Sequence, residues 1–219
     1  MRLVLLGPPG AGKGSFAQHV RDRWRLAHIA SGDLLREAVR AKTPLGVEAE
    51  RDMTRGELVP DALVTALIRE RVAGLAEGQG FVLDGFPRTE PQAVALDAAL
   101  REAGAPLDRV VYLKTTPAVI TGRLAGRRVC AACGQNYHVT NRPSRREGVC
   151  DRCGGRLEAR ADDQPATIAH RLEVYERQTA PMLAHYRRQG ILQTADGDQT
   201  IERLTDELGA GFRQAGLLA

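Results

Sequence analysis

The feature that most constrains this chain is a glycine-rich loop close to its beginning. Residues 2–6 form a short apolar run typical of a buried strand, which leads directly into Gly-Pro-Pro-Gly-Ala-Gly-Lys-Gly-Ser at residues 7–15. A strand, a glycine-rich turn and a following helix form a phosphate-binding loop, because the glycines let successive backbone N–H groups face one anion and the helix N-terminus adds its dipole. Lys13 would supply a mobile positive charge for the outer phosphates, and Ser15 a hydroxyl for Mg²⁺. We therefore expect a nucleotide-binding protein.

The motif departs from its strict form in one respect. The strict pattern places a hydroxyl residue directly after the lysine, whereas Gly14 here separates Lys13 from Ser15. The alternative interpretation is an ordinary glycine-rich turn with a surface lysine. The strand before the loop and the helix after it favour phosphate binding.

Short apolar runs alternate with helical patterns along the chain. We expect strands at residues 2–6, 26–30, 80–83, 109–114 and 191–194, with helices between and after them. This alternation predicts an α/β fold of the P-loop NTPase type, in which a five-stranded parallel sheet carries helices on both faces. In such sheets ligands bind at the carboxyl ends of the strands, where the loop at 7–14, Asp84 and Thr115-Thr116 are expected.

Capping and breaking residues give further expectations for the helices. Ser31-Gly32-Asp33 has the composition of an N-cap ahead of a helix at residues 34–40. Gln164-Pro165 is expected to begin a long helix, because proline suits the first turn, and Pro181 should kink or divide that helix.

Composition excludes some classes of protein and leaves others open. Hydrophobic residues make up 43% of the 219 residues and charged residues 26%, which is ordinary for a globular protein of one large domain or a core with small insertions. No apolar run approaches the roughly 20 residues of a membrane span, so we expect a cytoplasmic protein without a membrane partner. The net charge of +4 fits an anionic ligand but does not distinguish a nucleotide from a nucleic acid. Nothing marks an oligomer interface, so a monomer is expected.

All four cysteines fall in one segment, as two C-x-x-C pairs. Cys130 and Cys133 form the first pair, and Cys150 and Cys153 follow after 16 residues. This spacing is typical of a closed, structural Cys₄ zinc site, in which the metal replaces a hydrophobic core that so short an insertion cannot build. The alternative is two disulfides, which a reducing compartment disfavours. His138 is a possible further ligand but is more typical of a loop histidine.

The ordered set of motifs resembles the adenylate kinase family, in its long-lid, metal-containing bacterial form. The resemblance covers essentially the whole chain and is carried by residues 7–14, Ser31-Gly32-Asp33 with Arg36, the stretch from Asp84 to Thr89 with Gln92, residues 122–128, and residues 160–163 with Arg171. Ser15 and Ser31 stand where threonine is common in the family, and both keep the hydroxyl. Phe16 replaces a frequent glutamine and Ala30 a frequent serine.

The resemblance implies transfer of a phosphoryl group from ATP to AMP, giving two ADP, with Mg²⁺ accompanying ATP. It implies catalytic roles for Lys13, Asp84, Arg88, Arg123, Arg160 and Arg171. It implies ATP contacts from Gly10, Ala11, Gly12, Lys13, Gly14, Ser15, Arg123, Arg127 and Gln199. It implies AMP contacts from Ser31, Arg36, Met53, Glu57, Val59, Gly85, Arg88, Gln92, Arg160 and Arg171.

Within this resemblance Arg36 and Arg88 are expected on the acceptor monophosphate, and Gln92 on the acceptor base. Arg123, Arg160 and Arg171 should clamp the transferring group and the donor phosphates, while Asp84 should orient Mg²⁺ through water. The family organisation implies a core of residues 1–29, 60–126 and 164–219, an AMP-binding flap at 30–59 and a zinc-bearing lid at 127–163.

Two alternatives differ in substrate or class. A related kinase would use UMP or CMP as the acceptor, or GTP as the donor, because base selection is poorly specified by sequence. A zinc-ribbon ATPase that binds nucleic acid would fit the positive charge and the arginines around 142–146, but it has no obvious use for the Asp84–Arg88 motif. The histidines lie outside the phosphate motifs, so we expect direct in-line transfer rather than a phosphohistidine intermediate.

Overall fold

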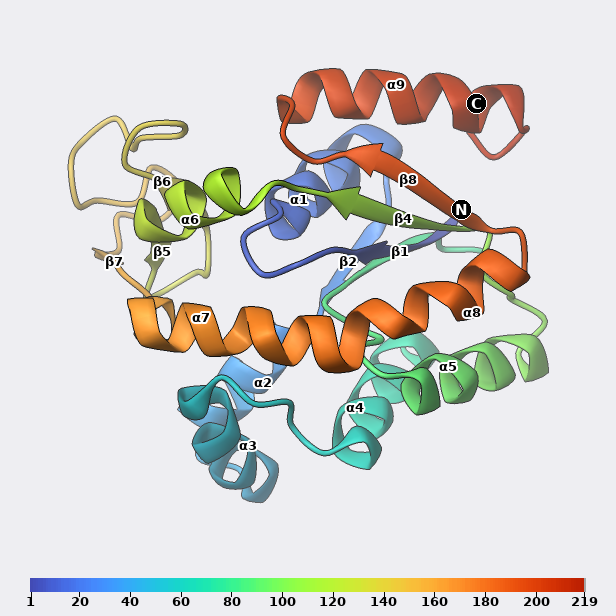
Figure 1. The fold of residues 1–219 in the computed structure, drawn as a ribbon, viewed down its shortest axis with the longest axis horizontal. Helices are drawn as coiled ribbons and strands as arrows, with labels where there is room; N and C mark the ends of the chain where they lie inside the picture. Colours follow the sequence, from blue (N-terminus) through green and yellow to red (C-terminus); the bar gives the residue numbers. More distant parts are fainter. Residues whose placement is uncertain (219) are drawn as a thin grey trace.

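Five parallel strands form the central sheet of the computed structural model, which describes residues 1–218. The spatial order is β2-β3-β1-β4-β8, and the glycine-rich loop follows the central strand (Figure 1). The strands are β1 (Arg2–Leu6), β2 (Ala27–Ala30), β3 (Phe81–Asp84), β4 (Arg109–Lys114) and β8 (Leu192–Asp196). The register places Val4 beside Leu83 on one side and Val110 on the other. The predicted fold class and all five predicted strands are confirmed, and Ala219 lies outside the described residues.

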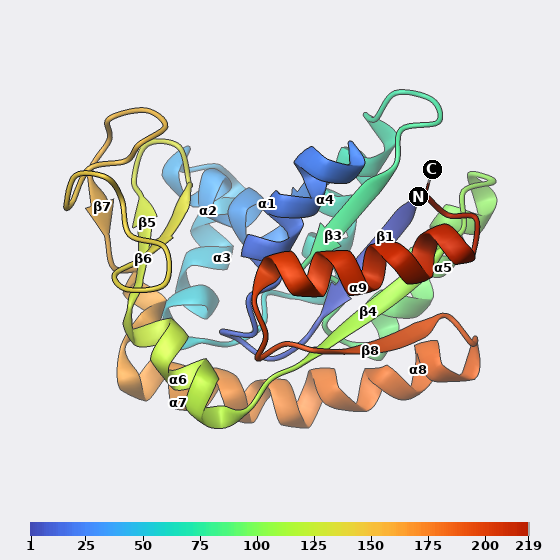
Figure 2. The same ribbon diagram turned by 90° about the horizontal axis from the view of Figure 1, so that it is seen from above.

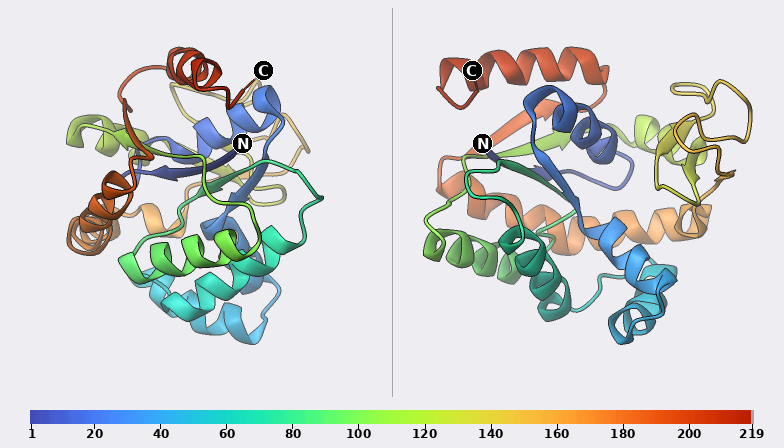
Figure 3. Two further views of the ribbon diagram at one scale, coloured as in Figure 1. Left: turned by 90° about the vertical axis from the view of Figure 1, so that its right-hand side faces the viewer. Right: turned by 180° about the vertical axis from the view of Figure 1, so that it is seen from behind.

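Alternate residues of the strands face two separate hydrophobic clusters. Leu3 and Leu5 pack with residues of α1 (Lys13–Trp24) and α9 (Ile201–Gln214). Figure 2 shows these two helices on the near side of the sheet. Val4 and Leu6 face the opposite cluster, to which α4 (Asp61–Ala73), α5 (Glu90–Glu102) and α8 (Leu183–Arg188) contribute. Figure 3 shows the sheet between these two layers. Burial on both faces explains why the strands are continuously apolar rather than alternating.

The glycine-rich loop ends in a helix whose first turn has no side-chain cap. Helix α1 begins at Lys13, and Gly12 precedes it at φ 91° without a capping hydrogen bond. At Gly10, also at positive φ, a Cβ would lie 2.9 Å from the Leu124 side chain. The backbone N–H groups at this helix end are therefore available to an anion.

Two short helices project beside the carboxyl end of the sheet. Helix α2 (Ser31–Arg40) is followed by α3 (Pro44–Arg55), which Thr43 caps by accepting a hydrogen bond from Gly46 N. The prediction that Ser31-Gly32-Asp33 caps a later helix is wrong, because α2 already begins at Ser31. The Ser31 hydroxyl instead donates to Gly85 O at 2.6 Å, which ties the start of α2 to the loop after β3.

Residues between the sheet strands β4 and β8 form a second, smaller sheet. Helix α6 (Pro117–Ala125) leads into three antiparallel strands, β5 (Arg127–Cys130), β6 (Asn136–His138) and β7 (Leu157–Glu158), in the order β6-β5-β7. Figure 1 shows this small sheet at one end of the molecule, close to α6 and the start of α7. The sequence did not predict these strands.

The long C-terminal helical segment is divided, as predicted at Pro181. Helix α7 (Pro165–Val174) continues as a π-helical stretch at Tyr175–Thr179 and a 3₁₀ turn at Ala180–Met182 before α8 begins. A further 3₁₀ turn at Ala161–Asp163 precedes α7. Across the described residues, none of the helices combines the length and the apolar character that a membrane span requires.

Candidate active site

Two adjoining cavities lie at the carboxyl ends of β1 and β3. The larger has a volume of about 1180 Å³ and the smaller about 120 Å³. Both are lined by Pro9, Lys13, Gly32, Arg36, Gly85, Arg88 and Arg171. The smaller volume is below the roughly 300 Å³ at which ligand pockets begin, so its walls must move apart to admit a nucleotide.

The predicted ATP and AMP contacts fall largely on different cavities, although Lys13, Arg36, Gly85, Arg88 and Arg171 line both. All the residues expected to contact ATP line the larger cavity: Gly10, Ala11, Gly12, Lys13, Gly14, Ser15, Arg123, Arg127 and Gln199. Most of those expected to contact AMP line the smaller one: Ser31, Arg36, Met53, Glu57, Val59, Gly85, Arg88, Gln92 and Arg171. Arg160 is the exception, because it lines the larger cavity. The fold thus gathers residues from distant parts of the chain around one site with two compartments.

Lys13 lies where the cavities meet. Its Nζ donates to Gly7 O at 2.7 Å and to Pro8 O at 2.9 Å, which holds the ammonium inside the loop. Loss of hydration lowers the pKa of Lys13 to about 7, although the negative charge of Asp84 opposes this shift. A phosphate in the cavity would favour the charged form of Lys13, and the attraction between the two charges would strengthen phosphate binding.

Arginine side chains from four separate segments surround the junction of the cavities. Arg88 is anchored by its Nε, which donates to Gly85 O at 2.7 Å, and burial followed by the charge of Arg171 lowers the pKa of Arg88 to about 10. Arg160 donates to Asn136 Oδ1 at 3.0 Å, and burial, then Arg36, lowers its pKa to about 9. Burial is the main cause of both shifts, and the repulsion of the neighbouring arginines adds to it; an anionic ligand would relieve that repulsion.

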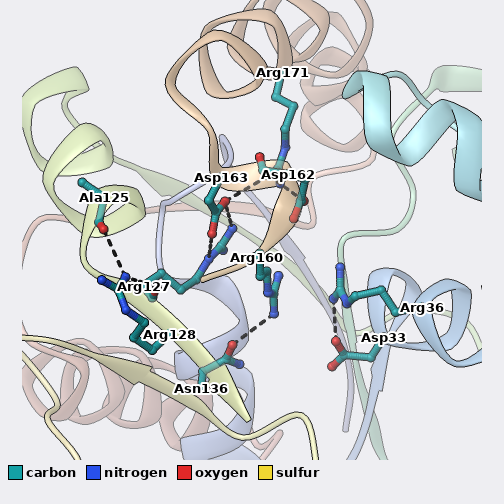
Figure 4. Close-up of polar contacts among 10 residues, drawn as sticks. All are labelled: Asp33, Arg36, Ala125, Arg127, Arg128, Asn136, Arg160, Asp162, Asp163 and Arg171. Carbon is teal, nitrogen blue, oxygen red and sulfur yellow. Dashed lines mark hydrogen bonds and ion pairs between the residues drawn. The ribbon is translucent and has the colours of Figure 1, made fainter. Parts of the chain in front are cut away.

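Two aspartates balance part of this charge, as Figure 4 shows. Arg171 Nη1 donates to Asp162 Oδ2 at 2.7 Å, and Arg127 Nε donates to Asp163 Oδ2 at 2.6 Å. Asp162 and Asp163 are the last residues of the predicted lid and belong to the motif at 160–163, but sequence reasoning gave neither a role at the site.

Asp84 reaches the first turn of α1 from the end of β3. A Cβ at Gly14 would lie 3.1 Å from Asp84 Oδ2, so the glycine that departs from the strict loop pattern makes room for this carboxylate. His28 Nε2 lies 3.5 Å from the same oxygen. Burial raises the pKa of Asp84, but hydrogen bonding and charge from His28, with Lys13 and Arg88, outweigh it and leave the pKa below its usual value. Sequence reasoning missed His28.

Arg123 lies apart from the other predicted catalytic arginines. Its Nη1 donates to Gly197 O at 2.7 Å and to Ala11 O at 3.2 Å, linking the phosphate-binding loop to the loop after β8. Burial lowers the pKa of Arg123, and the charges that act on it are those of Asp198 and Asp196 rather than the arginine cluster. Arg127, which lies just after the end of α6, is the residue that the structure brings into the arginine cluster.

The smaller cavity is closed by polar contacts between separate elements. Gln92 is 2% exposed, and its Oε1 accepts from Arg88 N at 2.7 Å. Its Nε2 donates to Asp61 Oδ1 at 2.6 Å. On the opposite wall, Glu57 Oε1 lies 2.7 Å from His170 Nε2, which joins the segment after α3 to α7.

The four cysteine thiols converge in the small sheet. Their Sγ atoms all lie within 4.8 Å of one another, and the four cysteines are free rather than paired in disulfides. The Sγ–Sγ distances are 3.5 Å for Cys130–Cys153 and 3.6 Å for Cys133–Cys150. His138 does not belong to this group, because its Nδ1 accepts from Thr140 N and Asn141 N.

Comparison with known proteins agrees with this geometry. A family model described as adenylate kinase matches residues 5–191. An adenylate kinase of Acidothermus cellulolyticus is 48% identical over 213 residues, which cover 97% of this chain and 98% of the relative. One of Carboxydothermus hydrogenoformans is 47% identical over 204 residues, covering 93% and 95%. With two adjoining cavities around one arginine cluster and this similarity over nearly its full length, the chain belongs to the adenylate kinase family.

Proposed function

We propose that this protein transfers the terminal phosphoryl group of ATP to AMP, giving two ADP, in a reversible and Mg²⁺-dependent reaction. The observation that carries the proposal is the convergence of Lys13, Arg88 and Arg171 at the boundary shared by the two cavities. Two nucleotides repel each other, and the transferring group spreads its charge over its oxygens, so the reaction needs convergent fixed cations more than a nucleophile.

The larger cavity holds the donor. The uncapped first turn of α1 and the loop before it bind the β- and γ-phosphates, and Lys13 neutralises the outer charge. We place Arg123 at the nucleoside end of the donor, since it links the loop at Ala11 to Gly197, beside Gln199. Arg127, rather than Arg123, then joins Arg160 and Arg171 in holding the transferring group.

The smaller cavity holds the acceptor. Arg36 and Arg88 bind its monophosphate. Arg36 Nη2 donates to Asp33 Oδ1 and Arg88 Nε to Gly85 O, so the phosphate is bound by the other N–H groups of each guanidinium. Gln92 faces the base, and Met53 and Val59 line the apolar wall. Mg²⁺ that accompanies ATP screens the phosphate charge, and Ser15 and Asp84 are the residues suited to hold it, Asp84 through water.

Transfer is direct and in line. An oxygen of the acceptor monophosphate is already anionic near neutral pH, so the reaction requires no general base. Of the histidines that line the larger cavity, His28 lies beside Asp84, and His138 Nδ1 accepts from Thr140 N. His19 also lines this cavity, so trapping of a phosphohistidine would contradict direct transfer.

We also propose that two mobile segments exclude water during transfer. The flap comprises residues 30–59 and the lid residues 127–163, both attached to a core of residues 1–29, 60–126 and 164–219. Supporting contacts cross from each segment to the core: Gln135 Nε2 donates to Gln18 Oε1 at 3.1 Å, and Glu57 pairs with His170. Arginines at both roots of the lid, Arg127 and Arg160, couple its closure to phosphate contact.

A zinc ion held by Cys130, Cys133, Cys150 and Cys153 would stabilise the lid. The residues fit such an ion, because Sγ–Sγ distances of 3.5 and 3.6 Å are close to the edge of a tetrahedron with Zn–S bonds of about 2.3 Å. Four thiolates close the coordination sphere, so the ion has a structural role.

Free thiols of this kind suit a reducing compartment, and we propose a cytoplasmic monomer without nucleic-acid or membrane partners.

Metal removal is expected to unfold the lid locally. Among the described residues, the buried cluster of the small sheet contains Cys130, Tyr137 and Cys150, with Cys133 and Leu157 partly buried against them. So small a cluster is too little to hold the sheet without an ion. After treatment with a chelator, hydrogen exchange measured by mass spectrometry should lose protection in residues 127–158 and keep it in β1, β3 and β4. The variant C153S should reproduce this pattern without a chelator. Loss of protection throughout the parallel sheet would contradict the local role.

The reaction itself is tested by a coupled assay of the purified, Mg²⁺-supplied protein. ATP with AMP should yield two ADP per turnover, faster than ATP with UMP or CMP and faster than GTP with AMP. A preference for another acceptor or donor would assign a related nucleoside monophosphate kinase. Release of inorganic phosphate without a second diphosphate would sink the proposal, and ping-pong kinetics would reject direct transfer.

A further inference from the structure

Asp61 lies behind the smaller cavity and binds two residues of the neighbouring helix. It is the first residue of α4, which lies beside α5 (Figures 1 and 3). Asp61 Oδ1 accepts from Gln92 Nε2 at 2.6 Å, and Asp61 Oδ2 accepts from the Thr89 hydroxyl at 2.7 Å. Asp61 does not line either cavity, so its contact with a ligand can only be through Gln92.

The partners of Gln92 allow its amide only one orientation. The backbone N–H of Arg88 can only donate, so the Gln92 atom at 2.7 Å from it must be the acceptor Oε1. The carboxylate of Asp61 can only accept, so the Gln92 atom beside it must be the donor Nε2. A flipped amide would place N–H against N–H and oxygen against oxygen in a buried position, which is strongly unfavourable.

The fixed amide retains one free donor and one free acceptor. Nε2 carries two hydrogens and Oε1 two lone pairs, and the contacts with Asp61 and Arg88 use one of each. Gln92 lines the smaller cavity, so the remaining pair can meet a base edge in one fixed order. Adenine presents an amino donor beside a ring-nitrogen acceptor, whereas hypoxanthine presents an oxo acceptor beside an N–H donor. A locked amide matches only one of these two edges.

We propose that Asp61 is a positioning residue that sets the base preference of the acceptor site by locking the amide of Gln92. The inference rests on the proposed function, in which the smaller cavity holds AMP. In this proposal Asp61, a residue outside the cavity, determines whether the site prefers a 6-amino or a 6-oxo purine nucleotide. Without Asp61, only the Arg88 N–H would oppose a flipped amide, so the other base edge would become accessible at the cost of that single contact.

The test compares AMP with IMP, which differ in this edge alone. Dissociation constants of both should be measured by isothermal titration calorimetry for the wild-type protein and for Asp61→Ala (D61A). In D61A, AMP binding should weaken by about tenfold, and the preference for AMP over IMP should fall by at least about tenfold. The KM for MgATP and kcat at saturating AMP should stay within about threefold of wild type, because the donor cavity is untouched.

Two matched variants separate positioning from general support. D61N should keep the AMP preference within about threefold of wild type, because the introduced amide can still accept from Gln92 Nε2 while it donates to the Thr89 hydroxyl. T89V removes the other contact of Asp61 and the N-cap of α5 but leaves the Gln92 lock, so it should lower thermal stability and keep the preference. Exchange of the Gln92 side-chain amide in the wild-type protein should show one Nε2 hydrogen slowed by about tenfold or more, which requires no variant.

The outcomes distinguish the two levels of inference. If D61A keeps the wild-type preference, or if T89V or D61N loses it as fully as D61A does, the role of Asp61 is overturned. If D61A does not fold, the other two variants and the exchange measurement decide. The role of Asp61 is then overturned if D61N or T89V loses the AMP preference, or if both Gln92 Nε2 hydrogens exchange fast. If the wild-type protein does not phosphorylate AMP at all, the proposed function fails instead.

Discussion

Replacing Arg88 with alanine is expected to lower kcat about a hundredfold or more, the scale of losing one transition-state contact of about 3 kcal/mol. Arg88 lines both cavities, and the bond from its Nε to Gly85 O fixes the guanidinium at their boundary. Its pKa, although lowered to about 10, keeps it charged at neutral pH. The measurement is kcat for R88A in the coupled assay with saturating ATP and AMP.

A matched control comes from the surface of α4. Arg69 is exposed and lines neither cavity, so R69A should retain the wild-type kcat. R88K should fall between R88A and wild type, because lysine keeps the charge but offers no planar pair of donors. Turnover of R88A within about threefold of wild type would remove Arg88 from the mechanism.

Replacing Lys13 with methionine is expected to lower kcat by about a thousandfold, at the upper end of the range for loss of one electrostatic contact. Methionine keeps most of the aliphatic stem, so the main loss is the ammonium that the carbonyls of Gly7 and Pro8 hold at the boundary of the cavities. Single-turnover measurement of ADP formation by K13M separates this loss of chemistry from weaker ATP binding.

Lys114 provides the control for this variant. It is exposed at the end of β4 and lines neither cavity, so K114M should leave both kcat and the KM for ATP unchanged. A K13M protein with only an elevated KM would show that Lys13 binds the donor equally in the ground and transition states. That result would contradict a role in stabilising the transferring group.

The outline of the fold was predictable because it depends on local patterns. Strands buried on both faces are continuously apolar, as in residues 81–83, and proline at 181 interrupts a helix wherever it lies. The strands of the small sheet were not predictable, because β7 has two residues and β6 three, too few to establish a period. The prediction for Ser31 failed because its hydroxyl binds a carbonyl 54 residues away rather than its own helix.

The candidate site shows the same division. Motifs identified the loop at 7–14 and the residues around Asp84, since their chemistry is encoded in adjacent positions. His28 and Asp61 carry no such signal, and Asp162 and Asp163 lie in the motif at 160–163 without an assigned role. Each acquires its place only when another segment brings it a partner: Asp84, Gln92, Arg171 and Arg127 respectively.

The sequence by itself determined the phosphate-binding loop, the parallel sheet and the two cysteine pairs, because glycine geometry, apolar periodicity and thiol spacing act over a few residues. Only the tertiary structure decided which arginines meet and which aspartates offset them. It also decided that Arg123 lies apart from this group and that Gln92 is held in one orientation. The physical reason is that charge and hydrogen-bond direction depend on distances between segments, and chain folding sets those distances.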